Sequence, residues 1–174
     1  LKVGFVAAEV APFAKTGGLG DVSASIPRYL HEAGHDVRLF MPHYDVINAH
    51  GQPGHPVEFL QDVPLRMGHR DLTFSVFSGM LPGTDLPVYF VDCPPLYARG
   101  GIYTQDPDEH VRFAFLARAA LESFQRMGFS PDILHANDWH TALLPIYLKT
   151  LYGWDALFSE TKTVLTIHNL AYQG

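Results

Sequence analysis

Short apolar runs alternate with helix-like segments along the whole chain, and this alternation limits the folds open to it. Residues 2–8 (KVGFVAA) form an apolar run of strand length. Residues 19–33 repeat apolar side chains at spacings of three and four, which is typical of a helix. Residues 36–41 (DVRLFM) are again strand-like and precede Pro42. A strand, a helix and a strand in this order form a βαβ unit with parallel strands.

The later segments extend this alternation. We expect helices at residues 107–127 and 138–151, strands at 87–92, 131–135 and 163–167, a hairpin formed by 57–63 and 71–78, and loops at 43–56 and 96–106. The order predicts an α/β fold: a Rossmann-like, doubly wound, mainly parallel sheet with helices on both faces. Ligands of such sheets bind beyond the carboxyl ends of the strands. The site is therefore expected in the loops that follow the strands.

Composition excludes several classes of partner. The 174 residues predict one domain, and the formal net charge of −6, with only 12 Lys and Arg, argues against nucleic acid. No apolar run reaches the roughly 18 residues that would indicate a membrane-spanning helix. The single cysteine, Cys93, allows no disulfide within the chain and fits a reducing compartment. The chain ends soon after a strand, so we expect a piece of a longer protein.

The loop KTGGLG at residues 15–20 follows the first strand and opens the first helix. Gly17 and Gly18 would expose backbone amides at a helix start, where an anion is favoured, and Lys15 adds a positive charge. A dinucleotide fingerprint would need glycine where Ser23 stands, and a P-loop would need a Gly-Lys pair that the chain lacks. An anion site and a plain glycine turn both remain open from these residues.

Histidines form three further motifs. His31 and His35 match the H-E-x-x-H zinc pattern, but Gly34 should end the helix between them, so we reject a zinc site. In HANDWH at residues 135–140, Asp138 could cap a helix, contact a substrate or, with the histidines, bind a metal. His168 follows the last strand and could be a polar edge residue or a donor in a site.

Acidic residues open the longest predicted helix. Asp108 and Glu109 fall in its first turn, where acids complement the helix dipole. Arg112 stands at helical spacing from both and could pair with them.

Several motifs together resemble one family, the bacterial glycogen synthases and plant starch synthases of glycosyltransferase family 5. The matching segments are EVAPFAKTGGLGDV at 9–22, MPHY at 41–44, LYARGGIY at 96–103, DILHANDWHTAL at 132–143 and TIHNLAYQG at 166–174. They follow the family's order and span the chain, and KTGGL with HNLAYQG is a far more specific signal than a lone glycine motif. The chain departs from the family at Glu109, where Asn is frequent, and at Asn137, where some relatives have His or Ala.

The resemblance implies a two-lobed glycosyltransferase B fold, with residues 1–174 as its N-terminal Rossmann-like lobe and the nucleotide-binding C-terminal lobe absent. It implies transfer of glucose from ADP-glucose to the non-reducing end of an α-1,4-glucan, with retention and without metal or cofactor. The fragment alone should be inactive. A non-catalytic glucan- or partner-binding lobe, or a related transferase using UDP-glucose, are the alternatives. We expect bacterial cytoplasm, with the plastid stroma as the other possibility.

The resemblance also implies roles for individual residues. Those expected at the reacting sugar are His168 and Asp138. Those expected to bind substrate are Lys15, Gly17, Gly18, Asp21, Tyr97, Tyr103 and Asn169.

Overall fold

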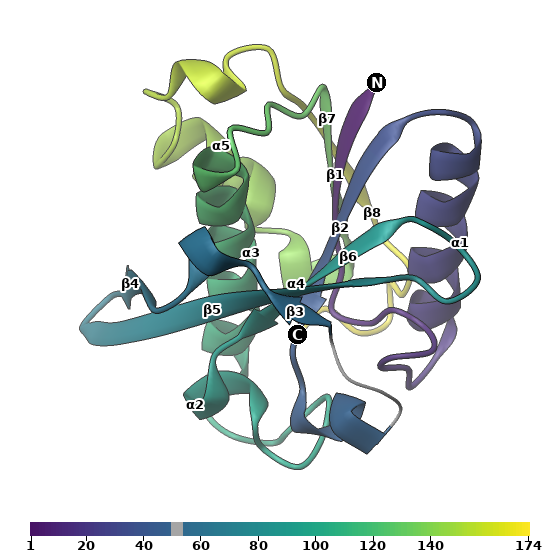
Figure 1. Cartoon of the computed structure of the whole chain (residues 1–174). Helices are drawn as coiled ribbons and strands as arrows, with labels where there is room; N and C mark the ends of the chain where they lie inside the picture. The colour runs from purple at the N-terminus through teal and green to yellow at the C-terminus, as the bar shows by residue number, and fades with distance from the viewer. Residues whose placement is uncertain (50–53) are drawn as a thin grey trace.

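A mixed sheet runs through the centre of the molecule (Figure 1). The computed structural model describes residues 1–49 and 54–174. Within them the sheet has the order β3-β5-β6-β2-β1-β7-β8, and β4 pairs with β5 outside this path. The strands are β1 (Lys2–Val6), β2 (Asp36–Pro42), β3 (His55–Pro56), β4 (Val63–Met67), β5 (Arg70–Met80), β6 (Pro87–Asp92), β7 (Ile133–Asn137) and β8 (Lys162–Thr166).

The five strands β6, β2, β1, β7 and β8 are parallel, whereas β5 runs antiparallel to β6, and β3 and β4 run antiparallel to β5. The chain builds the sheet outward from β1 in one direction to β2 and β6, and in the other to β7 and β8. The strand order therefore reverses between β1 and β7, which is the position where doubly wound sheets bind ligands. The predicted α/β fold with a mainly parallel sheet is confirmed.

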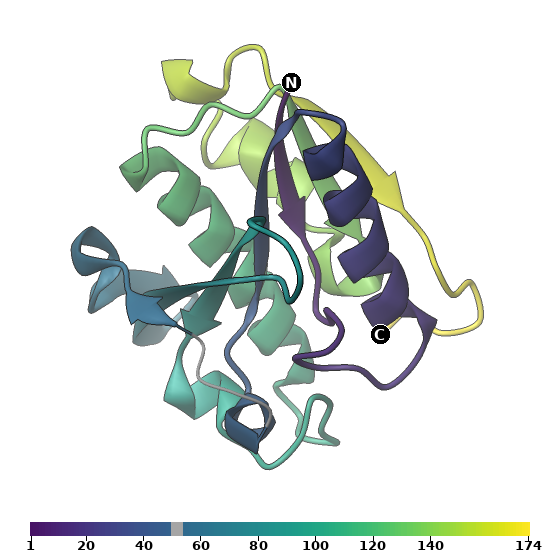
Figure 2. The same ribbon diagram turned by 45° about the vertical axis from the view of Figure 1, so that its right-hand side comes forward.

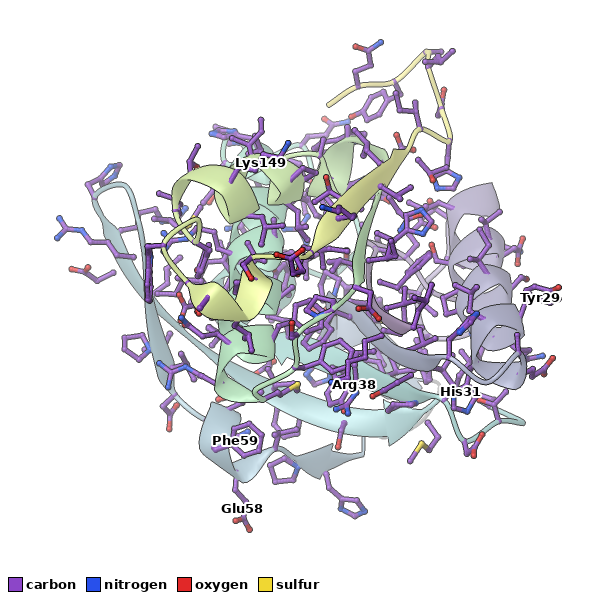
Figure 3. The ribbon with its side chains drawn as sticks, turned by 90° about the horizontal axis from the view of Figure 1, so that it is seen from above. Tyr29, His31, Arg38, Glu58, Phe59 and Lys149 are labelled. Atoms are coloured by element: carbon purple, nitrogen blue, oxygen red, sulfur yellow. The ribbon has the colours of Figure 1, made fainter. Side chains whose placement is uncertain are left out.

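Helices cover both faces of the sheet (Figures 1 and 2). They are α1 (Gly18–Glu32), α2 (Pro94–Tyr97), α3 (Glu109–Arg126), α4 (Asp138–Thr141) and α5 (Leu144–Thr150), with single 3-10 turns at Asp45–Ala49, Glu58–Leu60 and Ala156–Phe158. Helix α1 lies on one face, and α3 and α5 lie on the other. Viewed from above, Tyr29 projects from the outer side of α1 and Lys149 lies beyond the opposite face (Figure 3).

The core forms where α3 packs on the central strands. Gly4 in β1 allows this approach, because a Cβ there would lie 2.6 Å from Cζ of Phe124 in α3. Phe124 also meets Phe40 edge-on, with ring centroids 4.8 Å apart, and Phe40 stacks on Tyr89. All of β1 except Lys2 is buried, as its apolar sequence requires.

Two predicted elements differ from the structure. Residues 57–62 are not a strand: a 3-10 turn at Glu58–Leu60 precedes β4, which begins only at Val63, and the Gln61 side-chain amide holds the turn by donating to the carbonyls of Val57, Leu60 and Val76. Residues 138–151 form two helices, α4 and α5, because Pro145 has no N–H to donate to the carbonyl four residues earlier.

The remaining predicted helices and strands agree with the structure to within two or three residues at each end. The predicted loop at 43–56 contains the 3-10 turn Asp45–Ala49 and strand β3, and the predicted loop at 96–106 contains the end of α2. Positions 50–53 of the first loop lie outside the described residues. Gly34 has φ +86° and follows Ala33, the C-cap of α1, so the helix ends between His31 and His35 as expected. In the described part of the chain, no helix is long and apolar enough to cross a membrane.

Candidate functional site

A pocket of about 580 Å³ opens at the switch point between β1 and β7. Its walls come from the loop after β1, the start of α1, the loop before α3, the turn into α4 and the segment after β8. The lining residues are Glu9, Thr16, Gly17, Gly18, Leu19, Val22, Tyr103, Asp138, Trp139, His140, His168, Asn169 and Tyr172. Four stretches that are distant in sequence, 9–22, 103, 138–140 and 168–172, therefore meet in one cavity.

Glu9 organises the floor of this pocket, although the sequence analysis did not identify it. Its buried carboxylate accepts hydrogen bonds from the Thr16 backbone N–H (2.6 Å) and hydroxyl (2.9 Å), and from the Gly17 N–H at 3.4 Å. The hydroxyl of Tyr103 also donates to it, at 2.5 Å. Burial raises the pKa of Tyr103, and its bond to Glu9 raises it further, so the phenol stays protonated. An acid directly after a buried strand was the available signal.

The bonds to Glu9 change the interpretation of the glycine loop. One of the two amides that we expected to bind an anion, that of Gly17, is held by a carboxylate of the chain itself, together with the amide of Thr16. Neither packing nor backbone conformation within the chain requires glycine at these two positions. A Cβ on Gly17 or Gly18 would meet nothing within 4 Å, and neither residue has positive φ. Both line the pocket, so the space beside them is open to a ligand. The plain-turn interpretation leaves these two glycines unexplained.

Lys15 and Asp21 lie outside the pocket lining. Their side chains form an exposed ion pair with 2.7 Å between Nζ and Oδ2. The stem of Lys15 packs on Gly20, where a Cβ would lie 3.1 Å from the lysine Cβ and Cγ. The structure thus places the predicted cation next to the pocket entrance residue Thr16, but paired with the predicted acid.

Asp138 is held in an unusual backbone conformation at the end of β7, with φ +60°. Such a conformation costs a non-glycine residue about 1–3 kcal/mol, and strained residues of this kind cluster at ligand sites. Its Oδ1 accepts from the N–H of Trp139 at 3.0 Å, while Oδ2 has no hydrogen bond among the described residues. One carboxylate oxygen is therefore free for a ligand.

Asn137 connects Asp138 to His168. Its Nδ2 donates to the carbonyl of Val6 (3.2 Å), which orients the amide so that Oδ1 faces His168 Nε2 at 3.1 Å. Because an amide oxygen only accepts, Nε2 of His168 carries the hydrogen. The other nitrogen, Nδ1, is then the atom that neutral His168 can offer to a ligand as an acceptor. Asn137 is fully buried and is a positioning residue, although the sequence marked it only as a departure from the family.

Of the residues expected to bind substrate, Asn169 and Tyr103 line the pocket, whereas Tyr97 does not. Tyr97 is fully buried in α2, and its hydroxyl donates to the carbonyl of Arg112 at 2.8 Å. Placing it in an accessible loop was wrong, because Pro94 and Pro95 start a helical turn that directs the ring into the core.

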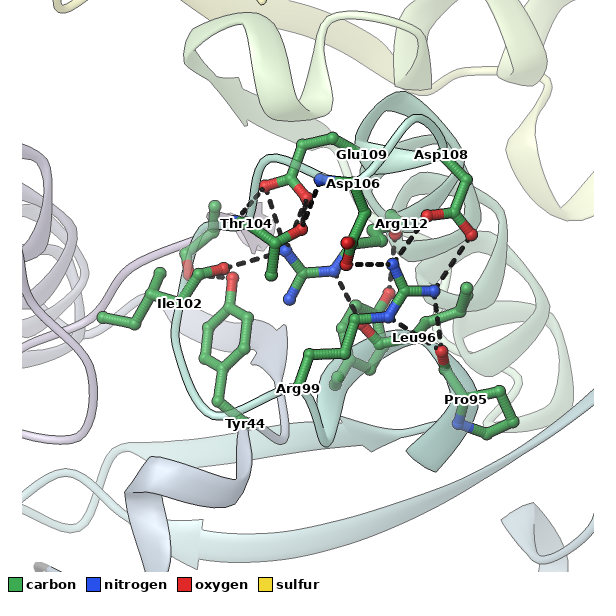
Figure 4. A network of polar contacts seen from close by, with 12 residues as sticks. Tyr44, Pro95, Leu96, Arg99, Ile102, Thr104, Asp106, Asp108, Glu109 and Arg112 are labelled. Atoms are coloured by element: carbon green, nitrogen blue, oxygen red, sulfur yellow. Dashed lines mark hydrogen bonds and ion pairs between the residues drawn. The ribbon is translucent and has the colours of Figure 1, made fainter.

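A second polar cluster lies beside the pocket, around the start of α3 (Figure 4). The guanidinium of fully buried Arg112 binds Glu109 at 2.9 Å, as its spacing predicted, and donates through Nε to the carbonyl of Leu96. Asp108 accepts from Arg99 at 2.6 Å and from Arg70 at 2.7 Å, and these bonds lower its pKa. Glu109 also accepts from the hydroxyl of Thr104, which fixes the loop that carries Tyr103.

Comparison with known proteins places these features in one family. Residues 2–174 match the family described as the starch synthase catalytic domain. The chain is 42% identical over 178 residues to a glycogen synthase of Aeromonas hydrophila and 42% identical over 174 residues to one of Streptococcus pneumoniae. All of this chain is covered, but only 36% and 35% of those relatives, so it spans about a third of their length.

A solved structure agrees with the sequence relatives. It is described as the catalytic domain of starch synthase IV from Arabidopsis thaliana bound to ADP and acarbose, and it has a TM-score of 0.79 and 32% identity to this chain. The match covers 97% of this chain and 34% of that one. The chain therefore belongs to the starch synthase catalytic domain family, as its sequence motifs indicated.

Proposed function

We propose that the complete protein containing this chain transfers glucose from ADP-glucose to the non-reducing end of an α-1,4-glucan, with retention of configuration. This chain would supply the N-terminal lobe, and a C-terminal lobe would close over it. The observation that carries the proposal is the single pocket in which Gly17, Gly18, Asp138 and His168 meet at the switch point. The related starch synthase described as bound to ADP and acarbose supports both ligand classes.

The charge distribution suggests how the two halves of a sugar nucleotide would lie. Glu9 and Asp138 place two carboxylates in the pocket, where they would stabilise positive charge on a reacting glucose. The free Oδ2 of Asp138 and the Nδ1 of His168 would accept from sugar hydroxyls. The diphosphate would lie toward Lys15. That lysine can leave Asp21 at little cost, because exposed ion pairs contribute only about 0–1 kcal/mol.

The first test measures ADP release and glucose incorporation by the complete protein with glycogen as acceptor. ADP-glucose should support turnover, and UDP-glucose should do so less well. The 174-residue chain alone should release no ADP above background, because donors on a second lobe are needed around the leaving diphosphate. Glucan binding without turnover by the complete protein would instead favour a non-catalytic binding lobe. Preference for UDP-glucose would overturn the donor assignment.

The second test concerns the cation at the pocket entrance. Lys15→Ala in the complete protein should lower kcat/KM for ADP-glucose by about tenfold or more, because a charge-assisted contact to phosphate is lost. Lys149→Ala, an exposed lysine on α5, is the matched control and should leave activity unchanged. Equal kinetics of Lys15→Ala and the wild type would remove Lys15 from the donor site.

The bacterial relatives support a further part of the proposal, that the complete protein works in the cytoplasm of a bacterium. Fractionation of the source cells, with activity followed in each fraction, tests it directly.

A further inference from the structure

His140 lies at the centre of an aromatic cluster on the pocket wall. Its ring stacks on Trp139, with centroids 4.1 Å apart, and on Tyr103 at 5.2 Å, while Phe113 meets it edge-on at 4.7 Å. Only 6% of the residue is exposed. Neighbours on three sides hold the ring, so its two nitrogens have fixed positions.

The two nitrogens have different surroundings. Nδ1 is buried and has no hydrogen-bond partner among the described residues. Nε2 also lacks a partner in this part of the chain, but it is not enclosed, and the ring lines the pocket. Burial lowers the pKa of His140 to about 3, so the ring is neutral near pH 7 and carries one hydrogen.

The position of that hydrogen follows from the free-energy cost of a buried donor without an acceptor and from the negative charge of the pocket. A hydrogen on Nδ1 would be a buried donor without an acceptor, which folded proteins rarely contain. A hydrogen on Nε2 can be satisfied at the open side of the ring. Glu9 and Asp138 line the same pocket as the ring, and their negative charge favours a hydrogen on the ring nitrogen that is open to this pocket.

We propose that His140 is a fixed, neutral donor that uses its Nε2–H to bind a hydroxyl of the sugar held in this pocket. The inference rests on the proposed function and adds a sugar-binding residue to it. The lining contains two acids and no Lys or Arg, so it suits an uncharged polyol better than a phosphate. A sugar can offer hydroxyl oxygens that accept from His140 and hydroxyl hydrogens that donate to the carboxylates of the same pocket.

Three substitutions in the complete protein distinguish the effect of the hydrogen-bond donor from the effect of the stacked ring. His140→Gln can place an amide N–H near the position of Nε2. His140→Asn reaches only the position of Nδ1, and His140→Phe keeps the stacked ring without a donor. We expect kcat/KM to fall by about 10- to 100-fold in the Phe and Asn variants, as when a polar group of a ligand loses its partner. The Gln variant should recover most of the loss.

Binding measurements show which part of the ligand is affected. The affinity for acarbose, measured by calorimetric titration, should fall by about tenfold or more in His140→Phe. The affinity for ADP should not change in any variant. Thermal unfolding of the Phe and Gln variants checks that each is folded. Acarbose affinity equal to that of the wild type in a folded Phe variant would overturn the proposal.

A spectroscopic measurement tests the tautomer without relying on activity. In protein labelled with ¹⁵N-histidine, the signals absent from His140→Phe belong to His140. Their shifts and couplings should place the hydrogen on Nε2, and a hydrogen on Nδ1 would overturn the inference. Absence of glucose transfer by the wild type would instead contradict the proposed function, and the acarbose titration would then decide the role of His140.

Discussion

The pocket and the polar cluster around Arg112 at the start of α3 lie side by side and contain similar side chains, but the hydrogen bonding of these side chains differs. In the cluster, Asp108 lies between two arginines, and Glu109 binds Arg112 and Thr104 (Figure 4). Its acids are satisfied within the chain, so the cluster holds a loop in place. In the pocket, Asp138 Oδ2 and His140 Nε2 have no partner among the described residues. Polar groups that a fold leaves unsatisfied in a cavity are the ones available to a ligand.

Removing Arg112, the fully buried cation of the cluster, should have the largest effect on stability. Arg112→Met leaves Glu109 without its cation and the carbonyls of Leu96 and Ile102 without the guanidinium donor, and breaking a buried ion pair costs about 3–5 kcal/mol. Urea unfolding measures the loss. Arg126→Met, on the exposed side of the same helix, is the control and should cost less than about 0.5 kcal/mol. Equal losses in the two variants would mean that the cluster does not stabilise the fold.

Two glycines provide the next test, because one serves packing and the other faces the pocket. Gly4→Ala would force a Cβ to within 2.6 Å of Phe124 and should lower the free energy of unfolding by about 1–3 kcal/mol. Gly18→Ala meets nothing within 4 Å at the start of α1 and should leave the stability equal or higher. Its turnover in the complete protein should nevertheless fall. A loss of stability without loss of turnover in Gly18→Ala would assign that glycine to the fold.

The smallest effect expected is on the pH dependence of stability. The folded-state pKa of His140 is about 3, below its unfolded value of roughly 6.5, so the unfolded state binds a proton first as the pH falls. Its contribution to stability is therefore present above pH 6.5 and declines down to about pH 3. Between about pH 7 and 5.5, wild type should lose roughly 1 kcal/mol more than His140→Phe in urea unfolding. Equal losses of unfolding free energy in the two proteins would mean that the pKa of His140 is the same in the folded and unfolded states.

Much of the site could be predicted from the sequence. The βαβ unit followed from apolar periodicity, and the rule on the carboxyl ends of strands selected the loops containing Gly17, Asp138 and His168. These loops do meet in one pocket. The family followed from motifs, which retain the residue types of a site even when their contacts are unknown.

The tertiary structure alone decided which groups are used internally and which remain open. Glu9 holds the loop amides, Asn137 orients His168, and Tyr97 turns into the core, while Nε2 of His140 stays uncovered. None of these follows from residue spacing within one helix or strand, because each depends on how separate elements and loops pack against one another. Apolar periodicity and glycine positions act locally and can be predicted along the chain. Burial and hydrogen-bond partners depend on which segments meet, and only the folded chain determines that.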